Sequence, residues 1–253
     1  MGRLPGLFTM DGIIIVLQYA VYLLEAGLLA YVFVRRRDSR LLSLSVYLGL
    51  LLAVDGISRP IVLYHYGFSS RQYAYFFWLT DVLLTLGAFL LICAFFRRAC
   101  KEQPKLWRFV RLLLVFVFVL VAGVSLASLT ANYQQVFTQF IVEFQQNLYF
   151  TCLVLTTLLY LLMQQLESAD DELGLLVCGM GIQFAGPAAN FALVHLTNGR
   201  GFPSTFYEYL GPLCTLGMLS VWFMAIARVP RPVRVPQPEA PAGELAMVTS
   251  RKA

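Results

Sequence analysis

The chain has 253 residues, of which 59% are hydrophobic and only 13% are charged. Soluble domains carry about 25% charged residues, so this composition excludes an ordinary soluble protein and indicates an integral membrane protein. The formal net charge is +5. We attribute that charge to membrane topology and to contact with anionic lipid headgroups, and we expect no nucleic-acid partner.

Hydrophobic runs long enough to cross a bilayer occur seven times. A helix needs about 20 apolar residues to span a hydrocarbon core about 30 Å thick. The runs are residues 12–34, 41–63, 73–96, 109–131, 137–163, 173–195 and 205–227. We therefore predict an all-α bundle of seven transmembrane helices over residues 1–227, with no room for a soluble catalytic domain. The first run is long enough to span and lacks a cleavage site, so we do not expect a removable signal peptide.

The distribution of basic residues predicts the orientation of the bundle. Basic side chains gather after the first run, after the third run and in the tail, including Arg35, Arg36, Arg37, Arg40, Arg97, Arg98, Lys101, Lys105, Arg108, Arg228, Arg231 and Arg234. The positive-inside rule then places the N-terminus outside and the C-terminus in the cytoplasm, in the cell inner (plasma) membrane. Residues 164–172 oppose this rule mildly, because this loop on the predicted cytoplasmic side holds four acids and no base.

The last segment, residues 228–253, differs from the rest of the chain. It contains five prolines with interleaved arginines and few large apolar residues. Such a composition favours a disordered or polyproline II segment. We expect it to be a cytoplasmic tail that lies near the inner leaflet.

The fourth run differs from the other six, because residues 112–124 contain no polar side chain. This suggests two groups of three helices joined by a lipid-facing helix, a 3+1+3 plan. A shift of 130 residues supports it, since His65 then falls on His195 and the sequence Thr-Leu-Gly at 85–87 falls on the same sequence at 215–217. Because one helix links the two groups, they would have the same orientation in the membrane and form a parallel pseudo-repeat. Some transporters have this architecture, but it does not decide the function.

Five carboxylates and an arginine lie well inside the hydrophobic runs: Glu25, Asp55, Arg59, Asp81, Glu143 and Glu208. Each costs roughly 2.5–3.5 kcal/mol at bilayer depth, so such residues usually face a bundle interior or a watery cavity. Asp55 and Arg59 are four residues apart and can pair within one helix. We expect a charge pair or gate from Asp55, Arg59, Glu25 and Glu208. Arg59 can neutralise only one of the five carboxylates, so the others need protons, cations or water.

The remaining polar residues recur at helical spacing, so that six helices each carry one polar face. The simplest assembly points these faces inward, with most of the charge in the outer half, which predicts a polar cavity open to the outside. The candidate ligand-binding residues are Trp78, Asp81, Glu143, Asn147, Gln183 and Asn190. The alternative is a structural network, in which buried polar groups hold the helices together.

Several classes of site are not indicated by the sequence. None of the five cysteines lies in a predicted outer loop, so no disulfide framework is expected. His65 and His195 are too peripheral for a metal or haem site. No lysine lies in any run, which excludes a retinal Schiff base. Without a catalytic motif of the phosphate-loop, zinc-protease or serine-hydrolase kind, we expect no enzyme and no cofactor.

The stretch YAYFFWLTDVLLTLGAFLLICAFFRR, residues 73–98, resembles a segment of a family of bacterial seven-helix membrane proteins without an assigned function. The shared features are outer aromatics, a Trp-x-x-Asp step at Trp78 and Asp81, and an apolar run that ends in Phe-Arg. The seven-helix, N-out layout is also similar to PQ-loop transporters and to bacterial membrane sensor modules. The Pro-Gln motif of the first group is missing from the runs, and no signalling domain is fused as the second group would require.

These observations lead to two functional hypotheses. The first is a sensor or transporter that binds a small molecule, proton or cation in an outer-facing polar cavity. The second is an accessory or scaffold subunit of a larger membrane complex, in which the polar faces hold the bundle together and another membrane protein is the partner. In both cases the lipid bilayer surrounds the protein.

Overall fold

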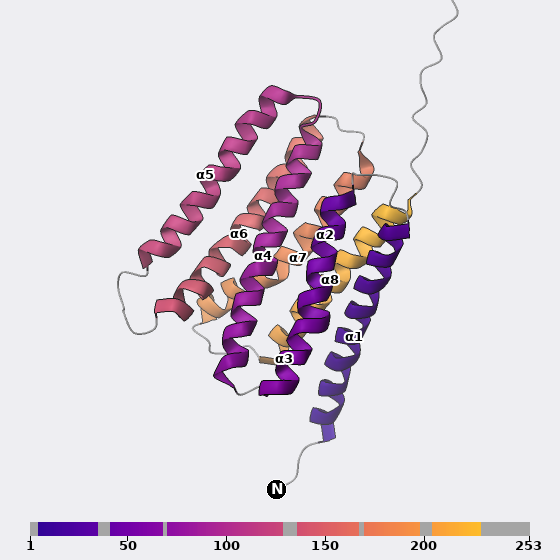
Figure 1. Cartoon of the computed structure of the whole chain (residues 1–253), viewed down its shortest axis with the longest axis vertical. Helices are drawn as coiled ribbons and strands as arrows, with labels where there is room; N and C mark the ends of the chain where they lie inside the picture. The colour runs from indigo at the N-terminus through magenta and orange to yellow at the C-terminus, as the bar shows by residue number, and fades with distance from the viewer. Residues whose placement is uncertain are drawn as a thin grey trace, which may run out of the picture.

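The computed structural model describes residues 5–34, 41–67, 70–128, 136–166, 170–197 and 204–228, and within them it contains helices and no strand (Figure 1). The helices are α1 (Pro5–Val34), α2 (Leu42–Leu51), η2 (Leu52–Ser58), α3 (Arg59–Tyr66), α4 (Arg71–Ala99), α5 (Pro104–Ser128), α6 (Val136–Gln165), α7 (Asp171–Thr197) and α8 (Ser204–Ala227). Because α2, η2 and α3 run on as one segment, seven helical segments of the described chain are long and apolar enough to cross a membrane. The predicted all-α, seven-helix architecture is confirmed. All but one residue of the predicted tail, the segment 229–253, lies outside the described residues.

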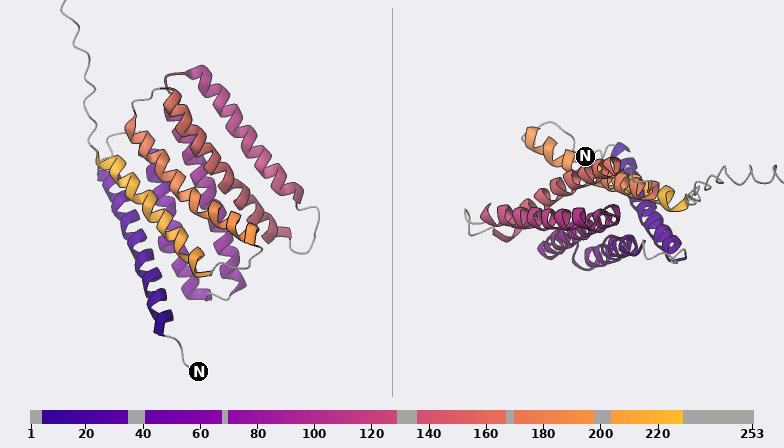
Figure 2. Two further views of the ribbon diagram at one scale, coloured as in Figure 1. Left: turned by 180° about the vertical axis from the view of Figure 1, so that it is seen from behind. Right: turned by 90° about the horizontal axis from the view of Figure 1, so that it is seen from above.

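Six of these segments form a ring in chain order. Going round it, α1 contacts the α2–α3 segment, which contacts α4, followed by α6, α7 and α8, and α8 closes the ring on α1. The remaining helix, α5, packs on α6 and α4 at the edge of the bundle (Figures 1 and 2). This peripheral position agrees with the predicted place of the linker helix, whereas the pseudo-repeat stays a prediction.

The bundle has two ends that are useful for locating residues. The lower end in Figure 1 is where α1 and α4 begin, and the upper end is where α4 and α8 finish. At the upper end Arg98 donates to Asp170 through Nε and Nη2 at 2.9 and 3.0 Å, and to Glu172 at 3.3 Å. We call these three residues the Arg98 clamp. Asp170 also accepts from the backbone N–H of Leu173 at 3.2 Å and so caps α7. Two acids from the loop 164–172, whose charge opposes the positive-inside rule, therefore pair with the basic end of α4.

The closest helix packing lies between α7 and α8, and it depends on glycine. A Cβ placed on Gly179 would lie 2.6 Å from the Trp222 ring nitrogen, and one on Gly186 would lie 2.5 Å from the Cys214 sulfur. Small residues let helix backbones approach in membranes. The approach lets the buried Trp222 indole donate to the carbonyl of Leu176 at 2.9 Å, which fixes one wall of the ring.

The helix that follows α2 changes its hydrogen-bond pattern at η2. There the backbone N–H of Arg59 donates to the carbonyl of Val54, five residues earlier, so the turn is a π-helix. Pro60 comes next and has no N–H, while its ring crowds the carbonyl four residues before it. The widened turn avoids that clash, and the Ser58 hydroxyl donates to the Ala53 carbonyl at 2.7 Å. Such turns are rare and frequently occur at functional sites.

Candidate functional site

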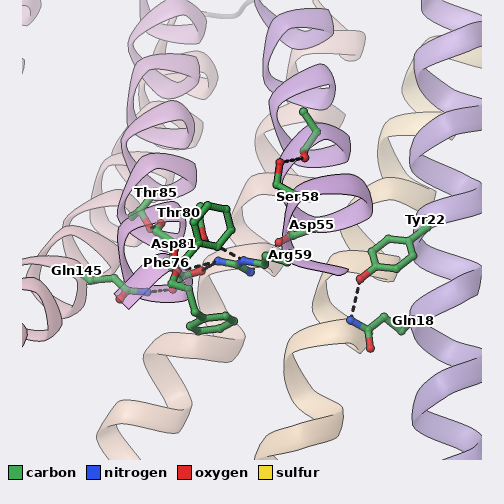
Figure 3. Close-up of polar contacts among 12 residues, drawn as sticks. Gln18, Tyr22, Asp55, Ser58, Arg59, Phe76, Thr80, Asp81, Thr85 and Gln145 are labelled. Atoms are coloured by element: carbon green, nitrogen blue, oxygen red, sulfur yellow. Dashed lines mark hydrogen bonds and ion pairs between the residues drawn. The ribbon is translucent and has the colours of Figure 1, made fainter. Parts of the chain in front are cut away.

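The centre of the candidate site is Arg59, whose guanidinium lies between two carboxylates from different helices. Its Nη1 is 2.6 Å from Asp55 Oδ1 and its Nη2 is 3.0 Å from Asp81 Oδ1. Asp55 belongs to η2 and Asp81 to α4, so the arginine ties these two segments together (Figure 3). The pairing that the spacing of Asp55 and Arg59 suggests is present. Arg59 contacts two carboxylates because a guanidinium offers five N–H donors in a fork, although its single charge can balance only one of them.

The rest of the Arg59 side chain is held by α4. Its Nε donates to the Thr80 hydroxyl at 3.2 Å, and Nη2 reaches the Phe77 carbonyl at 3.4 Å. The Phe77 ring lies 4.2 Å from the guanidinium carbon, in a cation–π contact. The predicted ligand residue Trp78 is half-buried, and its ring lies edge-on against Phe77 at 6.0 Å. These contacts hold the guanidinium in one orientation.

A third helix, α6, reaches the same carboxylate from the other side. The side-chain amide of Gln145 donates to Asp81 Oδ2 (Figure 3). Side-chain hydrogen bonds connect Tyr149, one turn further along α6, to Gln145 and to Thr85 of α4. Both oxygens of Asp81 are thus bonded. We call Asp55, Arg59, Thr80, Asp81 and Gln145 the Arg59 cluster.

The Arg59 cluster lies closer to the lower end of the bundle. At about 1.5 Å per residue, Asp81 is about 15 Å from the start of α4 at Arg71 and about 27 Å from its end at Ala99. The side chains of Arg59, Asp55 and Asp81 are 15, 25 and 19% exposed. The cluster is therefore enclosed but not sealed.

Glu25 of α1 differs from these acids. It is 1% exposed, and neither oxygen of its carboxylate has a hydrogen-bond partner among the described residues. It lies within electrostatic range of Asp55, so a third carboxyl group lies near the two that pair with Arg59. A buried charge without a partner is very costly, which makes Glu25 the least satisfied group near the cluster.

Two amide oxygens share this property within the described part of the chain. Gln145 Oε1 and Gln183 Oε1 are buried without a partner. Gln183 belongs to α7, next to Phe184, whose ring packs on that of Tyr149 at 5.9 Å. Every buried side-chain atom found without a partner is thus an acceptor oxygen, with those of Glu25 included.

The other predicted residues do not all point toward the cluster. Asn147 donates to Ser125 of α5 at 3.3 Å, on the periphery of the bundle, while Glu143, one turn before it, is half-buried. On α1, Gln18 is exposed and donates to the hydroxyl of Tyr22 at 2.8 Å. The expectation of one inward polar face per helix is therefore wrong for α6 and for this part of α1. The side chains of Asn190 and Glu208 lie outside the described residues.

Sequence reasoning missed Gln145, because it followed the stripe through Glu143 and Asn147. Residues two apart on an α-helix point to nearly opposite sides, so α6 carries two polar faces and the one with Gln145 and Tyr149 meets Asp81. The sequence did contain a pattern that indicates this second face, because Gln145 lies four residues before Tyr149 and residues four apart share a face of a helix. Thr80 was missed because the prediction singled out the charged residue next to it, Asp81.

Metal binding has no ready-made site in the described ranges, where no three His, Cys, Asp and Glu side chains are grouped as a metal ion requires. His65 is exposed and its ring packs edge-on against Tyr64 at 5.8 Å. His195 lies among the residues whose side chains are not described. Comparison of the chain with protein-family models, with curated proteins and with solved structures gives no match.

Proposed function

We propose that this chain is a multi-pass protein of the cell inner (plasma) membrane that binds a small molecule or cation at the Arg59 cluster, as a sensor or transporter. The observation that supports this proposal is the chemistry of the unpaired atoms. In the described residues all four are acceptor oxygens, and two of them belong to the Glu25 carboxyl group. A group that complements them carries positive charge or N–H or O–H donors, as an inorganic cation or a protonated amine does.

A purely structural network would be expected to satisfy its own members, because each unpaired polar group in hydrocarbon costs several kcal/mol. In the Arg98 clamp the arginine and both acids are hydrogen-bonded to one another. Near Asp81, by contrast, acceptor oxygens of Glu25 and Gln145 have no hydrogen-bond partner among the described residues. Asp81 is the junction of the site, because it contacts both Arg59 and Gln145. A ligand that enters would compete with Arg59 for this carboxylate.

The proposed orientation places the lower end of the bundle outside the cell, from the excess of basic residues near the upper end. Since Asp81 lies about 15 Å from the lower end of α4, the cluster would be reached from the outside. The Arg98 clamp would hold the cytoplasmic end of α4 against α7.

Thermal unfolding of the purified protein in detergent with lipid tests the proposal. The probes are sodium and potassium salts and a series of small protonated and quaternary amines. A ligand at 100 times its dissociation constant stabilises the folded state by about 2.7 kcal/mol, so an effective probe should raise the unfolding midpoint of the natural chain. Asp81→Asn should remove this shift. The matched control Asp171→Asn, an exposed position at the start of α7, should keep it.

Two results would overturn the proposal. One is a probe shift of the same size in Asp81→Asn and in the natural chain, because the ligand would then bind elsewhere. The other is the absence of any shift together with a stoichiometric membrane-protein partner in mild detergent. That second result would replace the binding function by that of an accessory subunit.

A further inference from the structure

Glu25 stands apart from every other acid in the described spans. The apolar residues Val21, Leu28 and Val32 are buried at helical spacing beside it on α1. The Glu25 side chain is as buried as these neighbours, at 1% exposure, and has no hydrogen-bond partner among the described residues. An ionised carboxylate in that position would lack any compensation, so the stable form of this group carries a bound positive charge.

The groups around Glu25 can be named element by element. Asp55 of η2 is the charge that acts on it, and Tyr22 of α1 and Tyr47 of α2 share the same electrostatic neighbourhood. Arg59 of α3 acts on Tyr22 but is bound to Asp55 at 2.6 Å. The other neighbour, α8, contributes the titratable side chains Tyr209 and Cys214 among its described residues, and Arg228 follows it.

This neighbourhood fits a proton better than a metal ion. Hard cations take six or more oxygen ligands or keep part of their water shell. Here the charged group that acts on Glu25 is Asp55, and Arg59 already bonds one of its oxygens. The described residues hold no group of three metal-binding side chains. A proton needs only one of the two Glu25 oxygens.

A graded series of polar groups leads from the lower part of α1 to Glu25. Gln18 is exposed, Tyr22 is half-buried and Glu25 is buried, and they lie on one face at spacings of four and three residues. Gln18 donates to the Tyr22 hydroxyl at 2.8 Å, and that hydroxyl keeps its own proton to donate. Figure 3 shows Tyr22 pointing from α1 toward the helix that carries Asp55 and Arg59.

We propose that Glu25 is a proton-binding site of this protein, reached through the Tyr22 hydroxyl that Gln18 orients, and coupled through Asp55 to the pairing of Arg59 with Asp81. The Glu25 carboxylic acid releases its proton to the Tyr22 hydroxyl oxygen as that hydroxyl passes its own proton toward water, so a carboxylate remains and no other bond changes. The proton site is defined by α1 and η2 themselves, and its coupling to a ligand rests on the function proposed above.

The direction of the coupling follows from charge. Release of the proton places a second negative charge beside Asp55, which draws the Arg59 guanidinium toward Asp55 and Glu25. Arg59 Nη2 is then held less firmly by Asp81, whose contact is already the longer one at 3.0 Å against 2.6 Å. Asp81 becomes available to a cationic ligand as Glu25 loses its proton, and by reciprocity ligand binding promotes proton release.

Infrared difference spectroscopy of the ligand-free protein in lipid vesicles tests the site directly. At neutral pH the natural chain should show the C=O band of a protonated carboxylic acid, and the band should decline as the pH rises. Glu25→Gln should lose the band, while the control Glu102→Gln, an exposed acid between α4 and α5, should keep it. A natural chain without the band, or a band that persists in Glu25→Gln, would overturn the proposal. Sodium that removes the band at fixed pH would show a metal-ion site instead.

Two further measurements separate the parts of the idea. Tyr22→Phe should slow the exchange of the band from hydrogen to deuterium several-fold, and an unchanged rate would overturn the route. The thermal midpoint of the natural chain should fall with rising pH while that of Glu25→Gln stays level, because the amide mimics the protonated acid. A level profile in both would contradict a proton held by the fold. If the natural chain lacks the infrared band, the proton site fails but cation binding at Asp81 is unaffected. If the band is clear but no ligand raises the unfolding midpoint, only the proton site is supported.

Discussion

The Arg59 cluster and the Arg98 clamp are both built around one arginine between two carboxylates, and they differ in depth. Each has one arginine that bonds two carboxylates and ties α4 to another segment. The clamp lies at the end of α4, and its acids begin α7, where Asp170 also caps the helix. The Arg59 cluster lies inside the spans and has unpaired acceptors beside it. The comparison teaches that an arginine with two acids is structural where helix ends and solvent complete it, and becomes a candidate site where the protein leaves acceptors unpaired.

The largest effect is expected from removal of the inner arginine. Arg59→Leu would leave Asp55 and Asp81 without their cation, and breaking an enclosed ion pair in this way costs about 3–5 kcal/mol. Arg59→Lys should cost less, because it keeps the charge but loses the fork that reaches both acids. Unfolding of both variants in mixed detergent micelles measures the difference. A loss below about 1 kcal/mol for Arg59→Leu would place the inner cluster in the class of the outer clamp.

A smaller effect is expected from the amide that completes Asp81. Gln145→Leu keeps a similar volume but removes the donor to Asp81 Oδ2. A buried acceptor left without a hydrogen-bond donor costs about 1–3 kcal/mol. The matched change Gln146→Leu, one residue along α6, should cost less because no hydrogen bond of Gln146 joins the cluster in the contacts described. Equal losses in the two variants would mean that Gln145 does not hold Asp81.

The smallest effect is expected from the outer clamp. Arg98→Gln removes two ion pairs whose acids are 32% exposed, and pairs in such surroundings contribute about 1 kcal/mol or less. High salt should reduce the difference between Arg98→Gln and the natural chain further, because exposed charges are screened. The Arg59→Leu loss should change much less with salt. A clamp that resists salt as the inner cluster does would remove the contrast between them.

The fold could be predicted because hydropathy alone defines helices that cross a bilayer. Seven runs and seven spanning segments agree, and the apolar stretch in α5 predicts a helix at the edge. The cluster could be predicted only where it is local. Asp55 and Arg59 are four residues apart, so their contact follows from helix geometry.

The rest of the site depends on how each helix is rotated about its axis, which the sequence does not state. Arg59 and Asp81 meet across 22 residues of sequence, and Gln145 meets Asp81 across 64. The face of α6 with Gln145 could not be preferred over the face with Asn147, because both carry polar side chains. Nothing in the sequence distinguishes Glu25, whose partners are missing, from Asp81, whose oxygens are both bonded.

The central claim is that the Arg59 cluster is a site for a ligand and not only a link between helices. The most direct test is a high-resolution density map of the protein purified in native lipid, inspected between Glu25, Asp81 and Gln145. The account predicts a bound non-lipid molecule, a cation or ordered water within hydrogen-bonding distance of the unpaired oxygens. A dry interior in which protein donors satisfy every one of these oxygens would contradict it and would make the cluster structural, like the Arg98 clamp.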